Sequence, residues 1–389
     1  MSFALWQPGW HWPLVAVAVF IVTAVLSAIA VGQSEDEWLG ARKRSLKRLF
    51  WLSLALVVLA LFAGQLHKLK GMLLRVQDGD PKWLGFAVGV EALSFVGYIA
   101  LSWGVFRRDA PRLNLPACIE MTFGGVVATR LFSAGGAGGI AFTTWALRAA
   151  GMAARTTAQS ISVFLAIMYA PYTAACILGG LGGGAPAAVT WSGVGIGVTA
   201  FACAALITLI PGDIERRARR VAAGKGRMAK LAAKLASVPA VAGEATRTAI
   251  SLAKRRPSLV GWAVLWWAAD VAVLDACFRA FDSPVPLGVL ILGYFLGHIG
   301  NLLPMPGGIG GVEGGMVGVF VACGVPLAAA IVGTIAYQVI STWLPVVPGL
   351  GAYFSLRRRV NRWRAEEGLE PEERGSKPVP GGRLRAAEH

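Results

Sequence analysis

Long apolar runs constrain the fold of this chain more than any other feature. Stretches of 18 or more mostly apolar residues recur along it: Leu14–Val31, Leu49–Leu66, Trp83–Phe106, Ser160–Leu181, Ala187–Ile210 and Ser258–Phe281. Each run is long enough to cross a hydrocarbon core about 30 Å thick. The whole chain is 56% hydrophobic, with a mean hydropathy of +0.60. The sequence therefore predicts an all-α integral membrane protein with about 7–8 spanning helices.

The formal net charge of +16 could suggest a nucleic-acid partner, but its distribution argues against one. Lys and Arg collect in the segments between apolar runs, which is the pattern that sets membrane topology. The segment 1–13 carries no Lys or Arg, whereas the segment Gln33–Arg48 carries five. The loop Pro211–Pro257 carries 12 and the tail after Ser355 carries nine. We therefore expect a multi-pass protein of the bacterial inner membrane, with its N-terminus outside and its C-terminus cytoplasmic.

The start of the chain allows two interpretations. Ala28-Ile29-Ala30 resembles a signal-peptide cleavage site, but no Lys or Arg precedes the apolar run. We expect the first span to be retained. Residues 1–82 would then form an N-terminal region of two spans.

The basic loop at residues 211–257 has a periodic pattern. Ile214, Val221, Met228 and Leu235 are spaced by seven, with basic residues between them. This pattern is typical of an amphipathic helix on the inner leaflet, although a solvated basic linker fits it equally well. The tail at 356–389 is rich in Glu, Gly, Pro and Arg, and we expect it to be disordered and cytoplasmic.

Two glycine clusters point to an internal repeat. Residues 134–140 read AGGAGGI and residues 306–312 read PGGIGGV, so all four glycines coincide when Ala134 is aligned with Pro306. This constant alignment, extended along the chain without gaps, is called the repeat register below. Short apolar segments flank both clusters, which predicts re-entrant helical hairpins at 117–152 and 287–323.

The repeats would be residues 83–210 and 258–355. The charge pattern makes their two hairpins enter from opposite sides, so we expect an inverted repeat. Such repeats hold substrate near the midplane, at their broken helices. Helix N-termini and exposed N–H groups at such tips attract anions.

The sequence thus predicts a substrate site at the two tips. It includes the glycines of both clusters and one proline: Gly135, Gly136, Gly138, Gly139, Pro306, Gly307, Gly308 and Gly310. The alternative is that the glycines only allow close helix packing.

Ionisable side chains inside apolar segments are costly and are functional candidates by default. They are Glu91, Glu120, Arg130, Arg148, Asp270, Asp275, His298 and Glu313. We assign Arg130 and His298 to substrate binding, because a guanidinium can hold a phosphate or carboxylate in a bidentate fork.

The acidic residues fall into three groups. Glu313 is expected to bind substrate, to pair with Arg130 or to carry a proton, and Asp270 is a second candidate for proton or ion coupling. Asp275 and Arg279 are spaced by four and could pair locally. Glu91, Glu120 and Arg148 stay open, since each could be part of a structural ion pair.

No catalytic or metal-binding motif is present in the sequence. The five cysteines all lie in apolar segments and form no CxxC pair, so neither a disulfide framework nor a zinc site is indicated. We expect no catalytic residue, no metal and no cofactor. An intramembrane lipid-modifying enzyme using Glu313 and His298 is a weaker alternative to transport.

The second glycine cluster and its flanks resemble a known family. The run from Gly297 to Gly349 contains the pattern P-x-P-G-G-x-G-x-x-E and ends in a span with W-x-P. It is similar to the closing signature of the lysylphosphatidylglycerol synthase transmembrane family, which includes the flippase portion of the multiple peptide resistance factor. The matching residues are Pro304, Pro306, Gly307, Gly308, Gly310, Glu313, Trp343 and Pro345.

The resemblance covers roughly residues 85 to 355 and is weaker at the first cluster. There the family often has a proline, where this chain has Ser133-Ala134, and Leu147-Arg148 matches its Leu-Arg-x-x-Gly element. The family also often has an arginine before the tryptophan of the last span, where this chain reads Tyr337-Gln338 and continues without charge to Trp343. The substrate could therefore differ.

The resemblance implies that the chain moves lipid between leaflets. Its expected partner is a membrane phospholipid, anionic or zwitterionic and possibly aminoacylated, or a lipid-linked intermediate. The family's soluble synthase domain is not in this sequence, so a separate cytoplasmic synthase is a further possible partner, docked through the loop 211–257. We expect no nucleic acid, and a homo-oligomer is possible.

Overall fold

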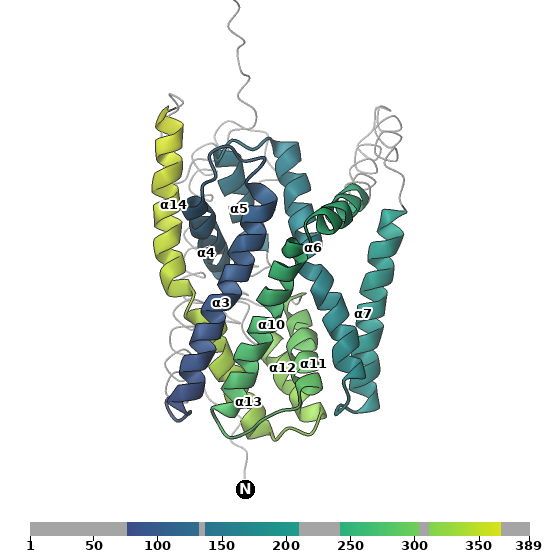
Figure 1. Ribbon diagram of the computed structural model, residues 1–389. Coiled ribbons are helices and arrows are strands. Elements are labelled where there is room, and N and C mark those ends of the chain that lie inside the picture. Colours follow the sequence, from purple (N-terminus) through teal and green to yellow (C-terminus); the bar gives the residue numbers. More distant parts are fainter. Residues whose placement is uncertain (1–75, 132–136, 210–241, 303–310, 367–389) are drawn as a thin grey trace, which may run out of the picture.

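The computed structural model describes residues 76–131, 137–209, 242–302 and 311–366, and these residues form a bundle of helices (Figure 1). Five helices are long and apolar enough to cross a membrane. They are α3 (Pro81–Phe106), α6 (Ala154–Leu181), α7 (Ala187–Thr208), α10 (Pro257–Arg279) and a continuous helical stretch, Leu327–Glu366. The predicted class of all-α membrane protein is confirmed. The two spans predicted before residue 76 lie outside the described residues.

Four shorter helices pack as two pairs. The first pair is α4 (Leu115–Leu131) and α5 (Ala137–Ala149). The second is α11 (Leu287–His298), continued by the 3-10 turn η2 (Ile299–Leu302), against α12 (Gly311–Ala322). The first pair lies in the upper half of the bundle in Figure 1 and the second in the lower half.

The long helices α3 and α10 lie side by side in the middle of the bundle (Figure 1). Glycine makes this close approach possible. A Cβ on Gly97 of α3 would lie 2.8 Å from the carbonyl oxygen of Trp262 on α10, closer than real Cβ atoms come to such an oxygen. Pro81 and Pro257 stand in the first turns of the two helices, where their missing N–H costs no hydrogen bond.

The buried apolar side chains form two clusters rather than one core. One cluster joins the end of α3 with α4, α5, the start of α6 and residues 245–249, and includes Phe106 and Leu147. The other joins α10, α11, α12 and α13 (Leu327–Gln338), and includes Phe278 and Phe320. The bundle therefore has an apolar core in each half.

The prediction that the C-terminal tail is disordered from residue 356 onward is wrong for its first part. After α13, the π-helical turn η4 (Val339–Trp343) leads into α14 (Val346–Glu366), so the chain is helical through the first part of the segment expected to be disordered. The reason is packing: Leu356 and Val360 are buried, and α14 lies against α4. Residues 367–389 lie outside the described residues.

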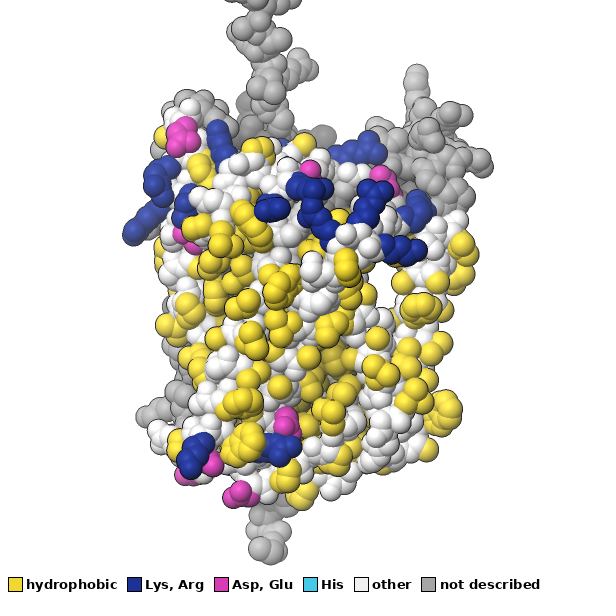
Figure 2. Space-filling model, in the orientation of Figure 1, with side chains coloured by type: hydrophobic (Ala, Val, Ile, Leu, Met, Phe, Trp, Pro, Cys, Tyr) yellow, Lys and Arg dark blue, Asp and Glu magenta, His cyan; other side chains and the backbone are white. Residues whose placement is uncertain are grey.

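The basic loop is helical in its second part. Residues 242–255 form a helix, and Ala245 and Ala249 are buried in the first cluster. The heptad pattern from Ile214 to Leu235 lies outside the described residues. Figure 2 shows Lys and Arg side chains concentrated at one end of the molecule, with a broad band of hydrophobic side chains below them.

Candidate functional site

A cavity of about 270 Å³ lies between the two apolar clusters and is the leading candidate site. Residues of α3, α4, α5, α6, α10, α11, α13 and η4 line it, so both short helix pairs contribute to its wall. Tyr169 of α6 lines the cavity and is 51% exposed, which means that one wall reaches the protein surface.

The cavity combines aromatic walls with two buried carboxyl groups. Aromatic side chains from several helices line it, including Phe95, Tyr98, Phe106, Phe164, Tyr169, Trp266 and Trp267. Glu91 on α3 is only 4% exposed and Asp270 on α10 only 6%. Ionisable groups at such depth are expensive and mark binding sites or ion pathways in membrane proteins.

Asp270 is held by hydrogen bonds from two other helices. The Tyr294 hydroxyl on α11 and the Tyr337 hydroxyl on α13 both donate to Asp270 Oδ2, the second at 3.0 Å. His298 stands one turn after Tyr294, with its Nδ1 2.8 Å from the Tyr294 carbonyl oxygen and its ring 4.4 Å from the Tyr294 ring. Asp270, Tyr294, His298 and Tyr337 thus form a continuous polar strip along the cavity, called the acidic strip below.

The residues that line the cavity follow the repeat register found between the glycine clusters. Seven lining residues come after residue 258, and six of them align in this register with a residue of the first half that also lines the cavity. The pairs are Phe95 and Trp267, Tyr98 and Asp270, Thr122 and Tyr294, Val126 and His298, Leu165 and Tyr337, and Tyr169 and Ser341. The two halves of the chain therefore present equivalent positions to one cavity, with different chemistry.

Three predicted site residues line this cavity: Asp270, His298 and Gly139. Gly138 is buried next to Gly139 in the first turn of α5. Glu313 lies in the first turn of α12, where a carboxylate interacts well with the helix dipole, and it is not among the described residues that line the cavity.

The remaining predicted site residues lie outside the described part of the structure, wholly or with their side chains. The backbone of Arg130 lies near the end of α4, and its side chain is outside the described part. The tip residues Gly135, Gly136, Pro306, Gly307, Gly308 and Gly310 also lie outside the described residues. The proposed pairing of Arg130 with Glu313 stays a prediction.

Glycines at the base of the tips bring the paired helices into close contact. A Cβ on Gly139 would lie 3.1 Å from the Gly125 carbonyl oxygen, and one on Gly311 would lie 2.6 Å from the Gly300 carbonyl oxygen. Close helix packing, the alternative considered for the glycine clusters, therefore holds at these positions.

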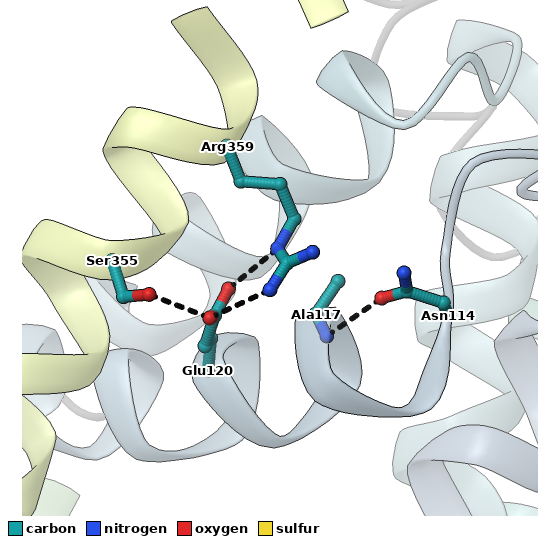
Figure 3. Close-up of polar contacts among 5 residues, drawn as sticks. All are labelled: Asn114, Ala117, Glu120, Ser355 and Arg359. Carbon is teal, nitrogen blue, oxygen red and sulfur yellow. Dashed lines mark hydrogen bonds and ion pairs between the residues drawn. The ribbon is translucent and has the colours of Figure 1, made fainter. Parts of the chain in front are cut away.

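The other ionisable residues have structural partners. The predicted local pair is confirmed: Arg279 Nε lies 2.7 Å from Asp275 Oδ2. Arg148 Nη1 donates to the Met152 carbonyl oxygen at 2.7 Å. Glu120 accepts hydrogen bonds from Arg359 and Ser355 of α14 (Figure 3).

Glu120 lies on α4, which is not one of the five candidate spans. Burial alone would raise the pKa of the Glu120 carboxyl group, but the hydrogen bonds from Arg359 and Ser355 outweigh this effect, and the pKa lies below its usual range. Glu120 is therefore an ionised, paired group, with a role in holding α14 to α4.

Tyr294 and Tyr337 were missed as site residues in the sequence. Neither tyrosine is charged, and each lies in an apolar run where an aromatic residue usually means packing. The available signal was the repeat itself. Aligning the two halves in full would have matched Tyr294 with Thr122 and Tyr337 with Leu165, at positions equivalent between the halves.

The fold and the cavity define a multi-pass helical membrane protein with a buried, acidic and aromatic site. A family model described as the lysylphosphatidylglycerol synthase TM region matches residues 50–349. The chain belongs to this family, as the second glycine cluster suggested. The expected membrane class and the family are both confirmed by this match.

Two relatives from Methanothermobacter thermautotrophicus are similar to shorter parts of the chain, and each is described as a UPF0104 membrane protein. One is 32% identical over 107 residues and the other 36% over 95 residues. The matches cover 26% and 24% of this chain and 30% and 27% of the relatives. The chain thus matches less than a third of each relative, whose descriptions say only that they are membrane proteins.

Proposed function

We propose that this protein is a lipid flippase or transporter that moves a phospholipid or lipid-linked intermediate between leaflets. The central observation is the cavity of about 270 Å³, which has aromatic walls and two buried carboxyl groups inside a largely apolar bundle. This volume suits a headgroup rather than a whole lipid, so the acyl chains would stay in the bilayer. The half-exposed Tyr169 would mark where headgroup and chains connect.

The proposal includes alternating access by two inverted units. Three observations support it: the glycine clusters, the paired cavity positions, and the helix starts, since Leu115 of α4 and Leu287 of α11 align in the same repeat register. The two short helix pairs lie in opposite halves of the bundle (Figure 1), as two re-entrant hairpins entering from opposite sides would.

The basic end of the molecule in Figure 2 would face the cytoplasm, by the positive-inside rule. Under this orientation the C-terminal end of α14, with its three consecutive arginines Arg357, Arg358 and Arg359, lies at the inner leaflet. The expected location in a bacterial inner membrane, with the N-terminus outside, is kept as part of the proposal.

The proposal is for a transporter rather than an enzyme. The reason is that the sequence contains no catalytic motif. Docking of a separate synthase is a second role that the basic surface could serve, and co-purification of a cytoplasmic enzyme would favour it.

The test is lipid translocation by the purified chain in proteoliposomes, with fluorescent phosphatidylglycerol and phosphatidylethanolamine as probes. We expect headgroup-selective movement in the wild type and its loss in Arg130→Ala and Glu313→Ala, with both variants folded. Full activity in either variant would remove that residue from the site. Headgroup turnover instead of movement would favour the enzyme, and neither activity in folded protein would favour the partner subunit.

A further inference from the structure

Lipid binding alone does not explain why a carboxyl group is buried at the position of Asp270. Asp270 is buried in the middle of a long apolar helix, and two tyrosine hydroxyls donate to its carboxyl group. Removing a carboxyl group from water is costly, and such groups within membranes recur in proton relays and ion pathways. The arrangement of hydroxyl donors from two other helices is a built environment for that carboxyl group.

The repeat provides an internal comparison. The first unit places Tyr98, Thr122, Leu165 and Val126 where the second unit places Asp270, Tyr294, Tyr337 and His298. Equivalent positions of the same cavity are therefore filled without a carboxyl or imidazole group. At these equivalent positions the first unit packs without a carboxyl or imidazole group, so packing does not explain why Asp270 and His298 occur in the second unit.

We propose that Asp270, held by Tyr294 and Tyr337, is a proton-binding site that couples lipid movement to a proton gradient. The inference rests on the proposed transport function and deepens it by naming the driving ion. In one state, the Asp270 carboxylate takes a proton from water on one side of the membrane and becomes a neutral acid. In the other state it returns that proton to water on the opposite side, so the carboxylate is restored in each cycle.

The geometry explains how protonation of Asp270 would change the packing of neighbouring helices. Asp270 belongs to α10, Tyr294 to α11 and Tyr337 to α13, so its two hydrogen bonds join three helices of the second unit. A carboxylate accepts from both hydroxyls, whereas a protonated acid has less acceptor capacity and gains a donor. Protonation would therefore loosen α11 and α13 from α10, around the wall of the cavity.

Other titratable groups share this environment and belong in any interpretation of pH dependence. From the helices packed against α10, these are Glu91 and Tyr98 on α3, Tyr169 and Tyr172 on α6, Tyr294 and His298 on α11, and Tyr337 on α13; Cys277 lies within electrostatic range on α10 itself. Glu91 is the second carboxyl group of the cavity, so the two acids would influence each other's protonation. The His298 ring packs against the Tyr294 ring at a tilt and would respond to the same change.

The first test measures proton binding without any transport. Infrared spectra of the purified full chain, recorded across a pH titration, should contain a carboxylic-acid carbonyl band that disappears as Asp270 ionises. We expect Asp270→Asn to lack that band and Asp275→Asn, on the same helix but paired with Arg279, to retain it. Tyr294→Phe and Tyr337→Phe should each move the midpoint to higher pH, because hydrogen bonds to a carboxylate favour the ionised form. Tyr353→Phe, outside the cavity, should leave it unchanged.

The second test measures coupling. Proteoliposomes of phosphatidylethanolamine and phosphatidylglycerol, with a trace of fluorescent phosphatidylglycerol, would be given pH gradients of either sign at clamped membrane potential. We expect the wild type and Asp275→Asn to translocate lipid at least threefold faster under one sign, and Asp270→Asn to show no dependence on the gradient.

The outcomes separate this inference from the proposed function. Lipid movement that ignores the gradient in the wild type would overturn the coupling and leave the transport function intact. An acid band that is unchanged in Asp270→Asn but lost in Glu91→Gln would overturn the proton site at Asp270, whether or not lipid moves. If Asp270→Asn loses the band and the wild type moves no lipid, the result would support the proton site and count against the transport function.

Discussion

Arg359 on α14 donates two hydrogen bonds of 2.9 Å to the carboxylate of Glu120 on α4, an element far earlier in the chain. Ser355 adds a third hydrogen bond to the same carboxylate, at 2.6 Å (Figure 3). The bidentate contact fixes the direction of the guanidinium as well as its distance. It holds the last described helix against the first helix of the first short pair.

Breaking this contact should loosen α14. In a double-mutant cycle with Glu120→Gln and Arg359→Gln, we expect a coupling free energy of about 1–2 kcal/mol, because hydrogen bonds between charged groups are the stronger ones. The measurement is thermal unfolding of the purified variants in detergent. Additive effects of the two single changes would show that the contact contributes nothing.

The Asp275–Arg279 pair offers a matched comparison. It is also an ion pair, but it lies within one helix, with side chains of Arg279 and Asp275 that are 42% and 27% exposed. The same cycle there should give only about 0.3–0.5 kcal/mol. A larger coupling for this pair than for Glu120–Arg359 would contradict the importance given to the inter-helix contact.

Gly97 should be indispensable for the contact between α3 and α10. Replacing it with valine would push side-chain atoms into the backbone at Trp262 and Trp266, so we expect destabilisation of about 1–3 kcal/mol or failure to fold. Gly89→Val, on the same helix where nothing lies within 4 Å of an added Cβ, is the control and should retain wild-type stability. Equal melting temperatures for the two variants would show that the helices can separate freely.

The second short helix pair allows a sharper comparison, between neighbouring glycines. A Cβ on Gly315 would lie 3.0 Å from the Gly297 carbonyl oxygen, whereas one on Gly314 meets nothing within 4 Å. Gly315→Val should therefore separate α11 from α12 and lower both thermal stability and lipid translocation. Gly314→Val should leave translocation unchanged and alter stability by no more than about 0.5 kcal/mol. A larger loss in Gly314→Val than in Gly315→Val would mean that a different face of α12 packs against α11.

Trp267 should stabilise the part of α6 around Pro171. Its indole Nε1 donates to the Met168 carbonyl oxygen at 2.6 Å, next to Ile167, whose carbonyl lacks its usual helical donor because Pro171 has no N–H. Trp267→Phe keeps an aromatic ring but removes this hydrogen bond, which should cost about 0.5–1.5 kcal/mol. Trp262→Phe, at an exposed position of the same helix, is the control for ring size. Equal losses of thermal stability in the two would show that ring size matters rather than the hydrogen bond.

The sequence was most informative where a property depends on local length and pattern. Apolar length predicted the spans, and helix spacing predicted the Asp275–Arg279 pair, because both are local. The hydrogen bonds from Tyr294 and Tyr337 to Asp270 depend on how three helices pack, and no local pattern contains that information.

The C-terminal tail is a second case in which tertiary packing could not be predicted from the sequence. Composition favoured disorder from residue 356 onward, because arginines and few apolar residues are typical of solvated tails. Leu356 and Val360 are spaced by four, however, and α14 buries them. Tertiary packing of two apolar residues, with the Arg359 contact to Glu120, outweighs the composition of the segment.

The cavity as the headgroup site is the central claim, and filling it is the most direct test. Thr143 of α5 lines the cavity, whereas Ala141 of the same helix is exposed and does not. We would measure translocation of fluorescent phosphatidylglycerol in proteoliposomes containing wild type, Thr143→Trp or Ala141→Trp, at matched folded protein. We predict at least a tenfold loss of rate in Thr143→Trp and a wild-type rate in Ala141→Trp. Translocation at the wild-type rate by Thr143→Trp would contradict the assignment of the headgroup to this cavity.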